Sequence, residues 1–184
     1  MKRALNPVVA FAVLLMATIP VAHGEVVAVG DQHFHIRIVM QVPAEPQAAY
    51  DQFVAIGDWW DPSHTWFGGE AELSIDPVAG GCFCERDETR SAKHMMVGLA
   101  NPGQEIRLIG GLGPLSTFAL NGTMIVRFQE NDGNNFISLE YRVTGMVDGG
   151  IANLAAVVDQ VLSGQMQRLG NKLDETASES RKAG

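Results

Sequence analysis

Two alternating segments and one long amphipathic segment dominate the last third of the chain. From Leu120 to Phe128 and from Phe136 to Thr144, apolar and polar residues alternate, which is typical of antiparallel strands with one buried face. Residues 130–134 between them are Glu, Asn, Asp, Gly and Asn, a composition that favours hairpin turns. From Ile151 to Leu173 the apolar spacing becomes helical. We therefore expect a β-hairpin followed by a long helix with one buried face.

The segments before this hairpin predict more strands and a short helix. Residues 32–42 alternate and predict the first strand, after which Pro46 suits the first turn of a helix that ends near Val54. An aromatic segment follows at 56–69. Four short strands are then predicted near 70–76, 80–86, 91–98 and 104–110, separated from one another by turns rich in Pro and Gly. A bend at 112–118 follows the last of them. This order predicts the α+β class.

The N-terminus predicts export. Lys2 and Arg3 precede an apolar run at 8–22, and Ala22 and Gly24 are small residues at the positions that a signal peptidase recognises. The run is too short for a stable membrane anchor, and no later segment is apolar enough to insert. We expect a signal peptide at 1–24, a lead-in at 25–31, one domain at 32–174 and a frayed polar tail at 175–184. Cleavage after Gly24 would deliver the protein to the periplasm or the medium.

The charge balance excludes some partners. The chain has 21 acidic and 13 basic residues and a net charge of −8, which becomes −10 once residues 1–24 are removed. Without a basic stripe, binding to nucleic acid or to anionic lipid is disfavoured.

Several local phrases resemble the SRPBCC or START-like superfamily, which has the helix-grip fold. The resemblance covers roughly Phe34 to Leu173 and is similar to the polyketide-cyclase-like and heat-shock-ATPase-activator-like branches. The phrases are Val42-Pro43-Ala44-Glu45-Pro46, Trp59-Trp60, Gly80-Gly81-Cys82-Phe83-Cys84-Glu85, Gly110-Gly111-Leu112-Gly113-Pro114-Leu115 and Gln165-Met166-Gln167-Arg168-Leu169. The resemblance implies a curved antiparallel sheet wrapped around the long C-terminal helix, with short helices after the first strand. It also implies a hydrophobic cavity between sheet and helix, and supplies no catalytic residue or cofactor.

The first functional hypothesis is an exported protein that holds a hydrophobic small molecule in this cavity. Apolar and aromatic side chains would form its walls and mouth, and the hydroxyl of Tyr141 would orient the ligand. For the aromatic rings, packing in the core is an equally good interpretation. The expected ligand-binding residues are Trp59, Trp60, Trp66, Met124, Tyr141, Leu154, Val158, Leu162 and Met166.

Two other hypotheses use the same domain. One is an enzyme of the cyclase, aromatase or dehydratase type, for which His64 and Tyr141 are the first catalytic candidates. The other is a module that binds a protein partner, which export disfavours. No established catalytic motif is present. Charged residues in the strands, among them Glu85, Glu105 and Glu140, are expected to pair with arginines on the outer face of the sheet; one that pointed inward would be a polar anchor.

Cys82 and Cys84 leave three alternatives. Residues i and i+2 of a regular strand lie about 6.5–7 Å apart, at the limit for a disulfide, although a bulge could close the gap. The pair is therefore interpreted as buried thiols or a disulfide, as part of a soft-metal site with His94 and Met95 or Met96, or as a redox centre.

Overall fold

The computed structural model describes residues 21–183 of the chain. Its elements are β1 (His23–Gly30), β2 (His33–Val42), α1 (Pro46–Val54), the 3₁₀ helices η1 (Ile56–Asp58) and η2 (Pro62–His64), β3 (Glu72–Ile75), β4 (Cys82–Arg86), β5 (Ser91–Asn101), β6 (Glu105–Ile109), η3 (Gly113–Phe118), β7 (Asn121–Asn131), β8 (Asn134–Thr144) and α2 (Ala152–Ala183).

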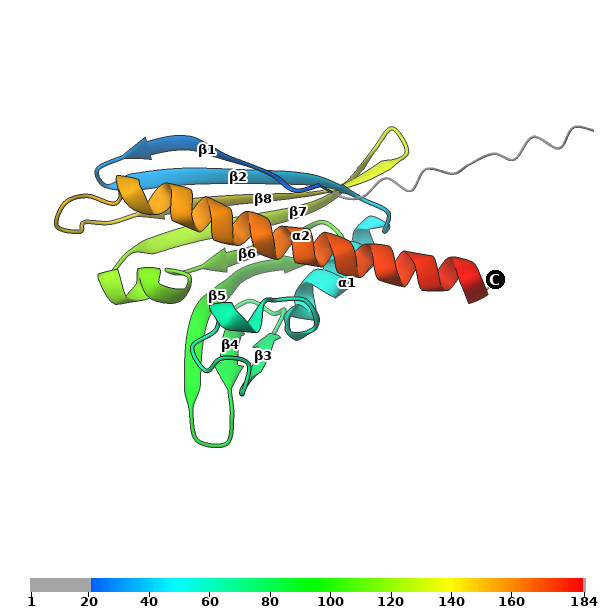
Figure 1. Cartoon of the computed structure of the whole chain (residues 1–184), viewed down its shortest axis with the longest axis horizontal. Helices are drawn as coiled ribbons and strands as arrows, with labels where there is room; N and C mark the ends of the chain where they lie inside the picture. Colours follow the sequence, from blue (N-terminus) through cyan, green and yellow to red (C-terminus); the bar gives the residue numbers. More distant parts are fainter. Residues whose placement is uncertain (1–20, 184) are drawn as a thin grey trace, which may run out of the picture.

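The strands form one antiparallel sheet in the order β1-β2-β8-β7-β6-β5-β4-β3. Because β2 pairs with β8, the first strand of the predicted domain lies beside the last, and the six strands between the helices follow as a meander. Figure 1 shows α2 lying across one face of the sheet, while β3, β4 and β5 bend away from the β1–β2 end. This is the predicted α+β helix-grip arrangement, which the structure confirms.

The core lies between the sheet and the helices, on the face that the alternation predicted. Phe34, Ile36 and Ile38 of β2 are buried, and so are Met124 of β7 and Tyr141 of β8. Three further residues from the helices, Phe53, Leu162 and Leu169, are also buried and belong to the same cluster. Such a core is held by burial of apolar area, at about 25 cal/mol per Å².

α2 differs from its prediction at the C-terminal end. The tail after Asp174 was expected to fray, yet the helix continues to Ala183. Salt bridge Lys172–Glu175 and the hydrogen bonds from Thr176 and Ser180 to carbonyl groups four residues earlier lie along this part. The charge pair one turn apart is of the kind that supports a helix beyond its apolar stripe.

β1 is a second difference, because the segment expected only to lead into the domain is a strand. It pairs antiparallel with β2 from His23 to Gly30 and forms an edge of the sheet. Nearly all its residues are exposed, which is why the sequence carries no alternation there.

Residues 1–20 of the predicted signal peptide lie outside the described residues. Cleavage after Gly24 would remove the first two residues of β1.

The outer face of the sheet carries the predicted charge pairs. Glu105 on β6 bonds to Arg107 and Arg127, and Glu140 on β8 pairs with Arg142 and His35.

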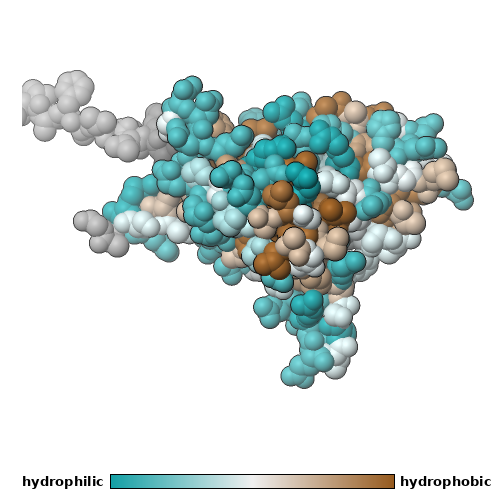
Figure 2. All heavy atoms as spheres, turned by 180° about the vertical axis from the view of Figure 1, so that it is seen from behind, coloured by the Kyte–Doolittle hydropathy of each residue, from teal (hydrophilic) through white to brown (hydrophobic). Residues whose placement is uncertain are grey.

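Figure 2 shows the molecule from behind, where hydrophilic residues cover much of the surface and hydrophobic residues gather near its centre. Within residues 21–183, no helix has both the length and the apolar composition needed to span a membrane.

Candidate functional site

The candidate site is a cavity of about 310 Å³ beside the N-terminal half of α2. Its volume lies at the lower end of the ~300–1,000 Å³ range of ligand pockets. The lining is mainly apolar and comes from the η2 segment, from η3 and its preceding residue, from α2 and from one residue of β5. The lining residues are Trp60, Ser63, His64, Thr65, Trp66, His94, Leu112, Gly113, Pro114, Leu115, Phe118, Leu154, Val157, Val158, Val161 and Leu162.

The structure brings together part of the predicted ligand-binding set. Five predicted wall residues line the cavity, as does His64, and they are Trp60, Trp66, Leu154, Val158 and Leu162. Trp59, Met124 and Met166 instead surround a void of about 10 Å³ under the middle of α2. The space between sheet and helix is thus filled by side chains, and the cavity lies to one side of it, against η2 and η3.

Tyr141 does not line this cavity, in contrast to its predicted role. Its ring is fully buried, and its hydroxyl donates to the carbonyl of Gly110 at 3.0 Å and accepts from the amide of Leu112 at 2.9 Å. Burial raises the pKa of Tyr141 to about 12. The hydroxyl is therefore engaged in holding the bend that leads into η3, and a ligand in the cavity has no access to it.

Gln165 of α2 fixes the η2 segment at the cavity mouth. Its side chain is buried, its Oε1 accepts from the amide of Asp61 at 2.8 Å, and its Nε2 lies 2.8 Å from Nδ1 of His64. Since Oε1 is an acceptor, Nε2 must donate, and Nδ1 of His64 must carry a lone pair. Neutral His64 therefore keeps its proton on Nε2.

Glu85 is the inward-pointing carboxylate that the alternation alone did not locate. It shares a face of β4 with Phe83, is fully buried, and accepts three hydrogen bonds. Oε1 accepts from the amide of Phe67 at 2.7 Å, and Oε2 accepts from the amide of Trp66 at 2.8 Å and faces Nε2 of His94 at 3.2 Å. The expectation that Glu85 pairs on the outer face is wrong: it anchors the aromatic segment to the sheet instead.

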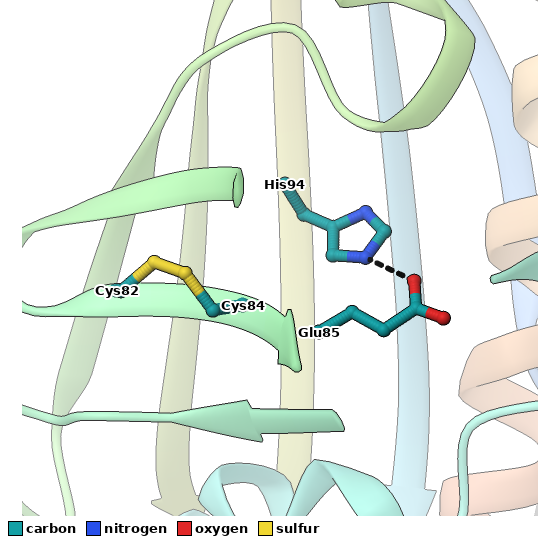
Figure 3. The surroundings of a disulfide bond; sticks show 4 residues. All are labelled: Cys82, Cys84, Glu85 and His94. Carbon is teal, nitrogen blue, oxygen red and sulfur yellow. Dashed lines mark hydrogen bonds and ion pairs between the residues drawn. A yellow bond between two sulfur atoms is a disulfide. The ribbon is translucent and has the colours of Figure 1, made fainter. Parts of the chain in front are cut away.

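His94 points inward because of a β-bulge. Phe83 pairs with Met95 and Cys84 pairs with Lys93, so the register between β4 and β5 skips His94. An extra residue of this kind turns two successive side chains to one face, and both His94 and Met95 are buried. The ring of His94 packs against Phe83 at 4.9 Å between centroids and reaches Glu85 (Figure 3). His94 is therefore the floor of the cavity.

The hydrogen bonds assign the tautomer of His94. Both oxygens of Glu85 already accept backbone amides, and a carboxylate can only accept, so Nε2 of His94 donates. Burial lowers the pKa of His94 and the neighbouring Glu85 opposes this only in part, so the ring is neutral at pH 7. Nδ1 then carries a lone pair. Figure 3 shows this nitrogen on the side of the ring away from the carboxylate.

The sequence contained only part of the signal for this pair. Glu85 lies two residues after Phe83, so alternation would have placed both on one face, but which face is buried was not determined locally. The bulge at His94 depends on the pairing of β4 with β5 and has no signature in the sequence. Alternation along β5 would have placed His94 and Met95 on opposite faces.

Cys82 and Cys84 form a disulfide, which the first of the three alternatives for this pair included. Their Cα atoms are 5.3 Å apart, within the usual range, at the point where the strand register shifts. Figure 3 shows the disulfide apart from the Glu85–His94 pair. The soft-metal alternative fails because the thiols bond to each other and His94 binds Glu85. Within residues 21–183, no three His, Cys, Asp or Glu side chains are grouped to hold a metal.

Solved structures of several proteins share this architecture. A protein from Rhodobacter sphaeroides matches with a TM-score of 0.55 at 11% identity, over 83% of this chain and 99% of that protein. Ara h 8.0201 matches with 0.53 at 13%, over 78% and 99%. The Aha1 dimer from Colwellia psychrerythraea matches with 0.50 at 10%, over 85% and 96%.

These likenesses concern the fold alone, because the identities are low. No protein-family model matches the chain, and no curated protein sequence matches it. A fold shared by proteins of different function does not specify an activity. The chain has the helix-grip fold, with a sheet of eight strands and a cavity beside its long C-terminal helix.

Proposed function

We propose that this protein is exported and binds a small, largely apolar molecule in the cavity between α2, η2 and η3. The main support for this proposal is the cavity itself. It has a volume of about 310 Å³, is lined mainly by apolar side chains and has one buried histidine at its floor. Its volume suits a ligand of one or two rings. Burial of the ligand's apolar area would supply the affinity, less the cost of ordering it.

The exposed aromatic rim supports entry from solvent. Trp66 and Phe118 line the cavity and keep 45% and 47% of their surface exposed, as does Val157 with 59%. Exposed apolar side chains at the opening of an apolar cavity are typical of a ligand-binding site. No observation on residues 21–183 specifically favours the third hypothesis, docking of a protein partner.

A cavity-filling variant tests the proposal. Val158→Phe adds a ring from α2 into the cavity, whereas Ala156→Phe adds the same ring at an exposed position of α2 outside the lining. With 2-methylnaphthalene as a neutral probe, followed by fluorescence of Trp60 and Trp66, we expect Val158→Phe to abolish saturable binding and Ala156→Phe to retain it. Equal binding by both variants, each correctly folded, would place the probe elsewhere and contradict the proposal.

Export is a separate part of the proposal. The disulfide between Cys82 and Cys84 supports it, because such bonds persist in oxidising compartments. Mass spectrometry of the protein isolated from its own host tests it: the intact mass should correspond to a chain that begins at Glu25 and has lost two hydrogens. A full-length mass from the cytoplasm would contradict export. A further non-covalent mass, present only under native conditions, would give the mass of the ligand.

A second candidate function, an enzyme of the polyketide-cyclase-like type, is favoured by the Glu85–His94 pair. A neutral imidazole whose other nitrogen donates to a buried carboxylate is arranged as a general base. In that role His94 replaces His64 and Tyr141 as the catalytic candidate. Its test is exchange of the α-hydrogens of 2-tetralone, a two-ring ketone, in D₂O. Faster exchange with the wild type than with His94→Gln would support it, and equal rates would refute it.

A further inference from the structure

We propose that Nδ1 of His94 is the recognition group of the cavity and selects apolar ligands that carry a hydroxyl group, which donates a hydrogen bond to it. This inference rests on the proposed binding function and names the class of ligand. It concerns the one buried polar side chain that reaches the cavity among residues 21–183, and it follows from three observations on Glu85 and His94.

The first observation is that His94 can offer the cavity only an acceptor. Its Nε2 donates to Glu85 at 3.2 Å, so Nδ1 keeps the lone pair. With Nε2 donating to Glu85, the imidazole offers the cavity this one acceptor and no donor. The acceptor is complementary to an O–H group and cannot bond to a carbonyl, an ether or a hydrocarbon.

The second observation is that Nδ1 is unpaired and accessible. His94 is only 5% exposed, and among the described residues Nδ1 has no hydrogen-bond partner. Part of the small exposed area of His94 belongs to this nitrogen. Because His94 lines the cavity, we infer that this area faces the ligand space. A polar ligand group that bonds to Nδ1 is favoured over an apolar group, which would bury it unpaired.

The third observation is the buried carboxyl group behind the ring. Glu85 is fully buried, and no arginine or lysine is among its bonding partners. Its carboxylate makes the floor of the cavity unfavourable for an anion. Ligands with a carboxylate at the inner end are therefore excluded, whereas a neutral phenol or alcohol is accepted.

A set of three probes of nearly equal shape tests this inference. These are 2-naphthol, 2-methylnaphthalene and 2-naphthoate, each titrated at pH 7 by calorimetry. We expect the wild type to bind 2-naphthol about 2- to 12-fold more tightly than 2-methylnaphthalene, since a hydrogen bond contributes about 0.5–1.5 kcal/mol. Binding of 2-naphthoate should be the weakest of the three.

His94→Gln is the decisive variant. Its side-chain amide can still donate to Glu85, which protects the fold, but it has no acceptor at the position of Nδ1. The preference for 2-naphthol over 2-methylnaphthalene should fall to less than 2-fold. Lys93→Gln is the matched control, because Lys93 is the exposed neighbour of His94 on β5 and lies outside the cavity lining. It should keep the wild-type preference.

The outcomes separate this inference from the proposed function. Equal affinity of the wild type for 2-naphthol and 2-methylnaphthalene would overturn the inference and leave the apolar cavity intact as a binding site. Tightest binding of 2-naphthoate would also overturn it, because an anion would then be recognised. Binding of none of the three would overturn the proposed function itself. As an independent readout, the ¹⁵N resonance of His94 Nδ1 should shift with 2-naphthol and stay unchanged with 2-methylnaphthalene.

Discussion

Nε2 of His94 lies 3.2 Å from Oε2 of Glu85, and both side chains are almost completely buried. The carboxylate also holds the amides of Trp66 and Phe67, so one residue of β4 connects the floor of the cavity to the segment at its mouth. We therefore expect a substitution of either residue to change both the stability of the protein and the shape of the cavity.

Replacement of Glu85 should destabilise the protein and loosen the mouth. Glu85→Gln places an amide nitrogen, which is a donor, against one of the backbone amides of Trp66 and Phe67. A buried donor without a partner costs about 1–3 kcal/mol. We expect this decrease in the unfolding free energy from urea titration, together with faster hydrogen exchange at the two amides. Glu88→Gln, the same change at an exposed turn residue, should change neither.

The stability of the protein should depend on pH through His94. Its pKa in the native state is lowered from 6.5 by burial, while the unfolded chain takes up the proton near pH 6.5. Between these two values the unfolded state binds more protons. The stability contributed by neutral His94 is thus complete above about pH 6.5 and is lost as the pH falls, by at most ~1.4 kcal/mol per pH unit.

Urea titrations between pH 8 and pH 5 check this dependence against His94→Gln. The titratable side chains near the ring are Glu85, which bonds to it, and His64, across the cavity. Both remain in the variant, so the difference between the two curves isolates His94. If the unfolding free energies of the two proteins change in parallel over the whole pH range, the pKa of His94 is not lowered by folding.

Loss of the Tyr141 hydroxyl should destabilise the bend before η3. Tyr141→Phe leaves the carbonyl of Gly110 and the amide of Leu112 without their buried partner, at about 1–3 kcal/mol. Tyr50→Phe is a matched control, because Tyr50 is also buried but its hydroxyl has no partner among the described residues. Thermal unfolding should therefore distinguish the two variants. A larger loss in Tyr50→Phe would contradict this interpretation of the two hydroxyls.

The disulfide should contribute little to stability. Because it closes a loop of only three residues, from Cys82 to Cys84, it removes little entropy from the unfolded chain, and the chain-entropy relation gives under ~2 kcal/mol. We expect Cys82→Ser/Cys84→Ser to fold and to lose no more than this in urea titration. Dithiothreitol should lower the stability of the wild type by the same amount and leave the double variant unchanged. A loss well above ~2 kcal/mol would show that the bond does more than close this loop.

The sequence determined which faces of the main elements are buried. Alternation placed Phe34, Met124 and Tyr141 in the core, and helical spacing placed Leu162 and Leu169 there, because burial of one face is a local, periodic requirement. Pro46 gave the start of α1 for a similar reason, since its fixed φ suits a first helical turn. Fold class and element order follow from such patterns.

Only the tertiary structure decided where the cavity lies and what it offers a ligand. The bulge that turns His94 inward arises from the pairing of β4 with β5, and the partners of Glu85 come from a segment almost 20 residues away. The hydroxyl of Tyr141 bonds to the backbone of Gly110 and Leu112, which lie outside its own strand. Hydrogen bonds of buried groups are satisfied by whatever the folded chain brings near, so a local pattern shows that a residue is buried but not what it contacts.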